Sequence, residues 1–463
     1  MDTAPAAVFA LLDDCHATPG RPCSRLYTGF VREHRCSDPA TLEAVWAAAR
    51  ADQRDGLHAL LLADYEWGAK LLRAGHAGLR EGEGEASSLR LLMFRSLERL
   101  SADQAGAWLA AQDHGRPEPS PAALGELAAS VRRDEFREAI AAVHEAIRAG
   151  ETYQINYTYR LDGRVQAEPA ALYRRLRARQ PVAYGAFIAL PPDGSGRQRH
   201  VLSCSPELFL RHRAGRLQAM PMKGTAARQP VPEGDSESAR LLSLDVKNRA
   251  ENLMIVDLLR NDLGRIARTG SVRVPALFAV ESYRTVLQMT STVEAELRPG
   301  LDLPEVLRAT FPCGSITGAP KHHTMELIAT LESTPRGLYC GAIGWIDAPA
   351  ADAPVTCGDF CLSVAIRTID LGAAAADGAR PMRLGVGAGI VLDSIAEDEF
   401  DECALKARFV TGLTPSGAAA ASAGSATSVP VLGHRHARPP APPTGLWPLD
   451  DMACGWAPEP AAA

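Results

Sequence analysis

Two ionisable side chains of opposite charge stand close together in the middle of the sequence. Glu207 follows Ser205-Pro206 at the edge of a strand-like run, and Lys223 opens the segment Lys223-Gly224-Thr225 soon after it. A carboxyl group that keeps its proton near neutral pH can act as a general acid, and a partly neutral amine can act as a nucleophile. For a lone lysine, a solvated surface charge is the ordinary alternative.

Three further carboxylates have the chemistry that a hard metal ion prefers. Glu251 lies in a run with helical periodicity, and Glu399 and Glu402 stand three residues apart, so on a helix their side chains point the same way. Mg²⁺ binds through one or two carboxylates together with substrate oxygens. Glutamates on a helix are more often solvated surface groups, so this pattern alone does not decide between the two interpretations.

Groups that could bind an anion follow toward the C-terminus. Arg367 ends an alternating run, and a guanidinium at a strand end can bind a carboxylate through two parallel hydrogen bonds. The segment Gly387-Ala388-Gly389 allows backbone N–H groups to approach an anion closely. Ser315 could offer a hydroxyl. The alternatives are a surface salt bridge for Arg367 and a turn serine bonded to its own backbone for Ser315.

The elements that must position these residues mix helices and strands. Alternation of apolar and polar residues predicts a half-buried strand over 153–160, with Gln154 and Asn156 on one face. Helical periodicity is found at 38–55, 120–150, 169–179 and 250–268, and further strand-like runs at 184–190, 200–211 and 383–392. Because no βαβ unit repeats, the pattern favours an α+β fold over a doubly wound one.

Composition excludes several classes of function. The 463 residues are 46% hydrophobic with a formal net charge of −6 and contain no block of basic residues, which argues against nucleic acid and membrane surfaces as partners. The ten cysteines form no CxxC pair, so we expect reduced thiols and, with no leader or membrane-spanning segment, a cytoplasmic location. Residues 414–463 are rich in Ala, Ser, Gly and Pro, which predicts a disordered tail.

Several segments together resemble the chorismate-utilising enzymes, a family that includes anthranilate, aminodeoxychorismate and isochorismate synthases. The matching segments are Tyr153-Gln154-Ile155-Asn156, Ser205-Pro206-Glu207, Met222-Lys223-Gly224-Thr225, the run from Arg249 to Asp262, the run from Gly314 to Lys321, Ala365-Ile366-Arg367 and the run from Gly387 to Val391. The resemblance covers roughly residues 125–412. It implies a β-sandwich-like core of large mixed or antiparallel sheets flanked by helices, with a chorismate-binding catalytic domain at 121–413 and a weakly similar N-terminal segment at 1–120.

The resemblance also implies roles for individual residues. Glu207 matches the general acid for departure of the chorismate 4-hydroxyl, and Lys223 matches a nucleophile that attacks C2. An acid in this role must hold a proton near neutral pH, so the resemblance implies that partial burial raises the pKa of Glu207. Glu251 and Glu402 match ligands of Mg²⁺, with Glu399 adjacent. The implied substrate-binding residues are Ser315, Tyr339, Arg367, Gly387, Ala388, Gly389 and Lys406.

Two positions indicate which branch of the family the chain resembles. A lysine at the position of Lys223 is found in aminodeoxychorismate synthases, where anthranilate and isochorismate synthases usually have alanine. Gln154 stands where isochorismate and salicylate synthases carry a lysine that activates water. The resemblance therefore implies amination of chorismate to 4-amino-4-deoxychorismate, on the route to p-aminobenzoate and folate. The sequence contains no Gly-x-Cys-x-Gly amidotransferase motif, so we expect a glutamine amidotransferase partner to supply ammonia.

Two alternatives stay open. The chain could be an anthranilate synthase component I, which Lys223 argues against. It could also be an inactive protein that binds chorismate or scaffolds an amidotransferase. An acid, a nucleophile and metal ligands are all retained at Glu207, Lys223, Glu251 and Glu402, which a binding protein would not need.

Overall fold

A computed structural model describes residues 7–73, 87–229, 231–282, 286–349 and 356–413. The helices are η1 (Pro39–Thr41), α1 (Leu42–Arg54), α2 (Tyr65–Leu72), α3 (Ala102–Gln112), α4 (Arg133–Arg148), α5 (Pro169–Arg179), α6 (Pro232–Leu244), α7 (Val246–Gly264), α8 (Leu303–Thr310), η2 (Gly314–Ile316), α9 (Lys321–Leu331) and α10 (Ala396–Thr411). The strands are β1 (Phe9–Asp13), β2 (Ser24–Cys36), β3 (His58–Ala63), β4 (Leu89–Leu100), β5 (Ala123–Leu124), β6 (Ala128–Ala129), β7 (Gln154–Gln166), β8 (Tyr184–Ala189), β9 (His200–Ser205), β10 (Leu208–Arg213), β11 (Arg216–Met220), β12 (Met222–Ala227), β13 (Arg273–Ser282), β14 (Val286–Glu296), β15 (Gly318–Ala319), β16 (Ala342–Ile346), β17 (Phe360–Val364), β18 (Thr368–Leu371) and β19 (Arg380–Ile390).

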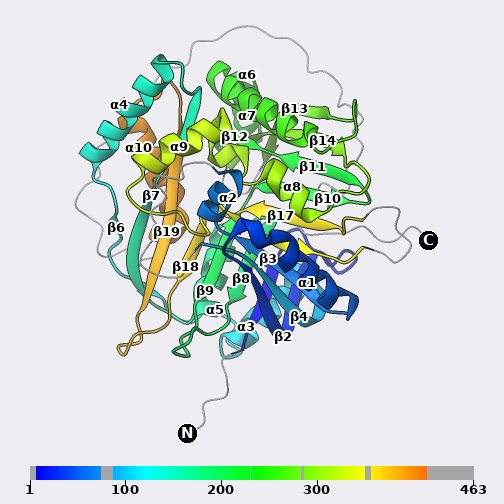
Figure 1. The fold of residues 1–463 in the computed structure, drawn as a ribbon. Coiled ribbons are helices and arrows are strands. Elements are labelled where there is room, and N and C mark those ends of the chain that lie inside the picture. The colour runs from blue at the N-terminus through cyan, green and yellow to red at the C-terminus, as the bar shows by residue number, and fades with distance from the viewer. Residues whose placement is uncertain (1–6, 74–86, 230, 283–285, 350–355, 414–463) are drawn as a thin grey trace.

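The strands form one continuous antiparallel sheet that folds back on itself (Figure 1). Neighbouring strands run in the order β14, β11, β10, β17, β16, β3, β4, β2, β1, β8, β9, β18, β19 and β7, with β12 and β13 beside β14, and β5, β6 and β15 beside β7. Strands β1 to β4 of the N-terminal segment lie in the middle of this order. Residues far apart in sequence are therefore joined through the sheet.

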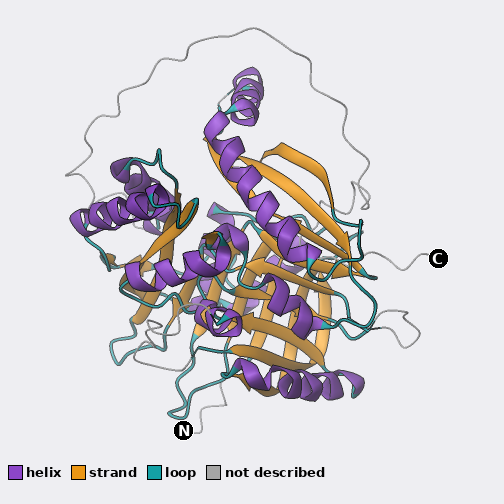
Figure 2. Cartoon of the chain, turned by 45° about the horizontal axis from the view of Figure 1, so that its top comes forward, coloured by secondary structure: helices purple, strands orange, loops and turns teal. Residues whose placement is uncertain are grey.

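Two hydrophobic cores explain why the sheet is stable in this shape. The smaller core contains residues almost entirely from strands, among them Tyr27, Phe94 and Trp345, and it lies where the sheet faces itself. The larger core lies between the sheet and the helices, which cover the outside of the strands (Figure 2). Such burial of apolar surface is the main force that holds the layers together. The expected α+β fold with a sandwich-like core flanked by helices is confirmed.

The structure corrects several details of the expected elements. The predicted helix at 120–150 begins only at Arg133, because the residues before it form the short strands β5 and β6 beside β7. The predicted strand at 200–211 is interrupted at Pro206 and Glu207, which separate β9 from β10. Residues 154–160 of β7 are buried on both faces instead of one.

Two expectations about the chain as a whole can be compared with the structure. Eight cysteines are free thiols, but Cys23 is disulfide-bonded, so the expectation of reduced thiols is wrong at that position. Within the described ranges, no helix combines the length and apolar character needed to cross a bilayer. The predicted tail at 414–463 lies outside the described residues.

Candidate active site

Glu207 occupies the two-residue connection between β9 and β10 and is almost completely buried, with 4% of its surface exposed. Its backbone is held by hydrogen bonds from Val364 N to its carbonyl (3.1 Å) and from its N–H to Ser205 Oγ (3.3 Å). Burial raises the pKa of its carboxyl group to about 7, against the opposing effects of Ser315, Lys223 and Arg367. The expected raised pKa of Glu207 is confirmed. Its Oε1 has no hydrogen-bond partner among the described residues.

Lys223 lies on β12 at a point where the strand departs from regular pairing. Met222 lies opposite Thr290 and Thr225 opposite Gln288, so β12 contains one residue more than β14 over this stretch. The extra residue is accommodated at Gly224, whose φ of 91° is a backbone conformation that favours glycine. Such a bulge changes the direction of a side chain. It directs Lys223 toward β19, because a Cβ at Gly389 would lie 2.6 Å from Lys223 Nζ.

The Gly387-Ala388-Gly389 segment is the interior of strand β19, not a turn. It pairs with β7, so that Gly387 lies opposite Thr158 and Gly389 opposite Asn156. Ala388 is fully buried in the larger core, so by strand alternation the two glycines lie on the other face, toward the site. Lys406 on α10 donates from Nζ to Gly387 O (2.8 Å). Glycine at 389 leaves space that a side chain would fill.

Carboxylates from two helices meet beside this strand. Lys247 Nζ, on α7, lies 4.0 Å from Glu251 Oε1 and 3.6 Å from Glu399 Oε1 of α10. Ser394 Oγ also donates to Glu399 Oε1 (2.7 Å). The pKa of Glu251 is raised, first by burial and also by the charges of Glu399 and Glu402, while Lys223 and Lys247 oppose the shift.

The donor chemistry of this cluster suits a hard cation, although an ammonium group now lies between two of its carboxylates. Glu402 pairs with Lys406 (2.7 Å) on the same helix. Within the described ranges, no three His, Cys, Asp or Glu side chains stand close enough to hold a metal ion together. Mg²⁺ commonly binds through only one or two carboxylates and completes its shell with water and substrate oxygens. The predicted ligands are therefore near one another but are not assembled into a closed metal site.

The remaining predicted binding residues surround Glu207 and β19. Ser315, in η2, is buried beside Glu207, with which it forms a hydrogen bond that lowers the carboxyl pKa. Arg367 connects β17 to β18 with a φ of 50°, a strained conformation for a non-glycine residue that is common at functional sites. Gln180, with its amide oxygen toward Arg367, accepts a hydrogen bond from Arg367 Nε (3.2 Å). Tyr339 lies farther along β19, where its ring packs on Gly385.

Two residues near the candidate site were not among the expected catalytic, binding or metal-ligating residues, although Gln154 was singled out as a position that separates branches of the family. Gln154 is completely buried, and neither its amide oxygen nor its nitrogen has a partner among the described residues. A Cβ at Gly389 would lie 2.6 Å from Gln154 Nε2, so the ends of the Gln154 and Lys223 side chains both lie over Gly389 of β19. Lys247 was also missed, although its position four residues before Glu251 on a helix signals an ion pair. Lys321, also part of the resemblance, is a structural cation that pairs with Asp262 and donates to Thr310 O (2.9 Å).

The arrangement combines a carboxyl group whose pKa is raised to about 7 with an amine, a hydroxyl and a guanidinium. Glu207, Lys223, Ser315 and Arg367 lie close enough to one another for Ser315, Lys223 and Arg367 all to influence the Glu207 carboxyl. On the other side of Lys223 stand the carboxylates of α7 and α10. Such a site can protonate a leaving hydroxyl, attack an electrophilic carbon and hold an anionic substrate.

Comparisons with known proteins agree with this chemistry. The family model of the chorismate binding enzymes matches residues 39–412. An aminodeoxychorismate synthase of Streptomyces griseus is 42% identical over 316 residues, which are 66% of this chain and 41% of the relative. Anthranilate synthase component 1 of Streptomyces coelicolor is 36% identical over 353 residues, which are 75% of this chain and 64% of the relative. The aligned part thus spans less than two thirds of either relative.

A solved structure shows the same fold. The crystal structure of a protein described as a 2,3-dihydroxybenzoate-specific isochorismate synthase of Bacillus anthracis superimposes with a TM-score of 0.67 at 19% identity. The superposition covers 89% of this chain and 97% of that protein. At this identity the likeness concerns the fold alone.

Proposed function

This chain belongs to the chorismate binding enzyme family, and on that premise we propose that it aminates chorismate to 4-amino-4-deoxychorismate. The observation that carries the proposal is a buried carboxyl group, with a pKa of about 7, beside the amine of Lys223. A protein that only binds chorismate would have no need for this combination. The similarity to an aminodeoxychorismate synthase supports the same choice.

The proposed reaction exchanges the 4-hydroxyl of chorismate for an amine in two steps. Lys223 Nζ forms a bond to C2, both conjugated double bonds of the ring shift by one position toward C4, and the C4–O bond breaks. Glu207 gives its proton to the departing oxygen, which leaves as water. Ammonia then bonds to C4, both double bonds shift back, and the C2–N bond to Lys223 breaks, while the proton that the new C4 ammonium loses restores the Glu207 carboxyl group. The overall change consumes one ammonia and releases one water.

The remaining residues bind and orient the substrate. Arg367 and Ser315 are placed to hold a carboxylate beside the acid, and the backbone of Gly387 and Gly389 is placed to accept the substrate along β19. We propose that Glu251 and Glu402 bind Mg²⁺, with Glu399 adjacent. A bound Mg²⁺ supplies positive charge that neutralises a substrate carboxylate.

The direct test is to incubate the purified protein with chorismate, Mg²⁺ and ammonium and to determine the product by mass. We expect a product in which amine replaces hydroxyl and the enolpyruvyl group is retained, with loss of activity in Lys223→Ala by a factor of about 1,000 or more. Chelation of divalent cations should abolish turnover, and added Mg²⁺ should restore it. Anthranilate as the product would favour the alternative synthase, and no turnover would favour a binding protein.

We propose that a glutamine amidotransferase supplies the ammonia. It docks over the part of the site where the predicted metal ligands Glu251, Glu399 and Glu402 lie. Both flanks of the Lys247–Glu399 ion pair carry exposed apolar side chains: Val246 is 81% exposed, and Ile395, at the start of α10, is 61% exposed. Exposed apolar groups at a polar rim are typical of protein interfaces. Ammonia released there would enter beside Lys223.

Substitutions at this surface should affect glutamine-dependent turnover but not ammonium-dependent turnover. Replacing Val246 and Ile395 with aspartate should reduce glutamine-dependent turnover in the presence of the amidotransferase by about tenfold or more, because charges enter an apolar contact. Turnover with ammonium salt should be unchanged, since neither side chain takes part in the chemistry. Equal loss with both nitrogen sources, or no loss with either, would contradict the docking site.

A further inference from the structure

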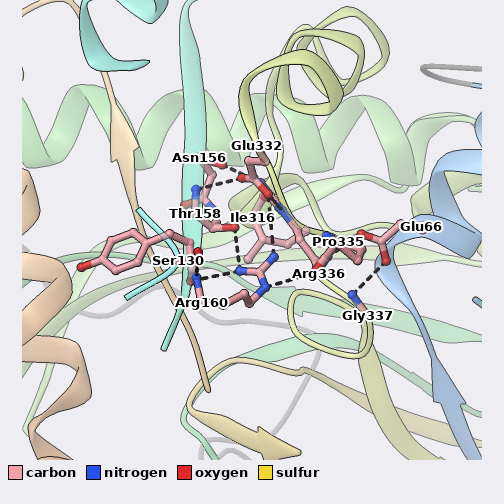
Figure 3. A network of polar contacts seen from close by, with 11 residues as sticks. Glu66, Ser130, Asn156, Thr158, Arg160, Ile316, Glu332, Pro335, Arg336 and Gly337 are labelled. Carbon is pink, nitrogen blue, oxygen red and sulfur yellow. Dashed lines mark hydrogen bonds and ion pairs between the residues drawn. The ribbon is translucent and has the colours of Figure 1, made fainter. Parts of the chain in front are cut away.

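A network of buried charges lies behind the substrate-binding strands (Figure 3). Its centre is Arg336, which is only 3% exposed and donates from Nε (3.0 Å) and NH2 (2.6 Å) to the carboxylate of Glu332. The same guanidinium donates from NH1 to Ile316 O (2.7 Å) and from NH2 to Asn156 O (2.7 Å). Arg336 thus joins three separate segments of the chain.

Both backbone carbonyls that Arg336 binds belong to substrate-binding elements. Ile316 directly follows Ser315 in η2. Asn156 stands opposite Gly389 in the pairing of β7 with β19. These bonds add to the direct pairing of β15 with β7, so the guanidinium helps to fix the separation between Ser315, beside Glu207, and strand β7.

The carboxylate of Glu332, which binds Arg336, also binds the backbone of β7. Glu332 Oε1 accepts a hydrogen bond from Thr158 N (2.8 Å), and Thr158 stands opposite Gly387. Arg160, which is completely buried, lies 3.8 Å from Glu332 and donates from Nε to Pro335 O (3.1 Å). The turn that carries Arg336 is therefore tied to β7 at several points.

The N-terminal segment reaches this network at the start of α2, through the side chains of Tyr65 and Glu66 and a hydrogen bond from Tyr65 N to Gly337 O (2.8 Å). Glu66, on α2, accepts hydrogen bonds from Arg336 N (2.6 Å) on one carboxylate oxygen and from Gly337 N (2.9 Å) on the other. Glu66 is itself buried, and the ring of its neighbour Tyr65 lies 4.2 Å from the Arg336 guanidinium. The N-terminal segment thus binds the backbone of the turn that carries Arg336, and the Arg336 side chain binds the carbonyls of Ile316 and Asn156.

We infer that Glu66, Arg336 and Glu332 are positioning residues through which the N-terminal segment sets substrate affinity. The inference rests on the proposed function for the identity of the substrate. Replacing Glu66 with glutamine leaves one acceptor and places an N–H₂ group against a backbone N–H donor. A buried donor that faces another donor is unsatisfied, so the turn must shift and Arg336 with it. The acid and the amine are not bonded to this network.

The test compares Glu66→Gln with the wild-type protein by steady-state kinetics with chorismate and ammonium. The KM for chorismate should rise about tenfold while kcat changes by less than about twofold. Arg336→Lys, which loses the bonds that the planar guanidinium makes to two carbonyls, should raise KM similarly, and the two changes combined should be non-additive because they act through one network.

Asp113→Asn is the matched control. Asp113 is also a buried carboxylate of the N-terminal segment, and it accepts hydrogen bonds from Ser120 N (3.0 Å) and Arg174 NH1 (2.6 Å), neither of which belongs to the site. This variant should lower the melting temperature and leave KM unchanged. An equal rise in KM in the control, or no rise in Glu66→Gln, overturns the inference.

Amide hydrogen exchange provides a measurement independent of turnover. In Glu66→Gln, peptides covering 154–160 and 314–319 should exchange faster than in the wild-type protein, and in Asp113→Asn they should not. A wild-type protein that fails to convert chorismate would refute the proposed function. Unchanged exchange in Glu66→Gln would refute the coupling whatever the substrate is.

Discussion

At the scale of single residues, the chemistry depends on environment more than on residue type. Glu207 and Glu402 are both glutamates of the site, yet burial raises the pKa of Glu207 to about 7, whereas Lys406, Lys223 and Lys247 lower the pKa of Glu402 against its own burial. One carboxyl group is therefore suited to hold a proton and the other to hold a cation.

The raised pKa of Glu207 predicts a specific pH dependence of turnover. Because the acid must be protonated, kcat/KM of the free enzyme should fall about tenfold per pH unit above about pH 7. Glu207→Gln should lose most activity, and its residual activity should lack this alkaline decline. A profile that stays flat to pH 9 in the wild-type protein would contradict the role of Glu207 as the acid.

The same shift predicts an effect on stability. The folded state binds the Glu207 proton more tightly than the unfolded state, whose ordinary pKa is 4.5, so the carboxyl group destabilises the fold increasingly as pH rises from 4.5 through 7. Relative to the wild-type protein, Glu207→Gln should gain stability over that range, by about 3 kcal/mol at pH 8. Urea unfolding at pH 5 and pH 8 provides the comparison.

At the scale of elements, strand β19 combines two different requirements for glycine. A Cβ at Gly389 would lie 2.6 Å from the ends of two side chains, those of Lys223 and Gln154. A Cβ at Gly387 would lie 2.6 Å from the backbone oxygen of Tyr157. Side-chain ends can move aside, whereas a paired strand cannot.

Alanine substitutions should therefore separate activity from stability along β19. Gly389→Ala should reduce kcat/KM by about 100-fold or more, because it displaces the proposed nucleophile, with little change in melting temperature. Gly387→Ala should unfold at a lower temperature by several degrees, because it forces two paired strands apart. Gly194→Ala, where a Cβ meets nothing within 4 Å, is the control and should change neither quantity.

At the scale of the whole molecule, a buried histidine ties stability to pH. His200, on β9, is 7% exposed and stacks on Phe187 with ring centroids 6.0 Å apart. Burial, with a contribution from Arg380, lowers the pKa of His200 to about 4 from its ordinary 6.5. The unfolded chain therefore takes up a proton between pH 6.5 and 4 that the folded protein does not bind.

Stability should consequently fall as pH is lowered through this range. The lowered pKa of His200 reduces the free energy of unfolding by about 2 kcal/mol at pH 5 and does not change it at pH 8. Raised pKa values at Glu66 and Asp64 act in the opposite direction, so the wild-type curve alone does not isolate it. The stability of His200→Phe relative to the wild-type protein should therefore increase between pH 8 and pH 5. A difference that is independent of pH would contradict this account.

Local patterns predicted many elements because they depend on neighbouring residues. The helices α5 and α7 and the strands β7, β8 and β19 lie where periodicity placed them, within a few residues. Periodicity did not predict that both faces of β7 are buried, since Phe400 of α10 stacks on Tyr159 while Arg160, on the other face, donates to Pro335 O, and both partners come from distant parts of the chain. It also missed the break at Glu207, although Pro206, which has no N–H to donate to a neighbouring strand, precedes it.

The properties of the candidate site likewise fall into those that the sequence determined and those that only the tertiary structure determined. The sequence alone determined the family and the residue types at Glu207, Lys223, Glu251 and Glu402, because motif order and chemistry are local properties of the chain. Only the tertiary structure decided that Glu207 is buried beside Lys223, that Lys247 lies between carboxylates of two helices, and that Glu66 holds the turn behind the substrate-binding strands. Burial, and with it every pKa shift and buried ion pair, depends on which distant segments pack together, and no local pattern carries that information.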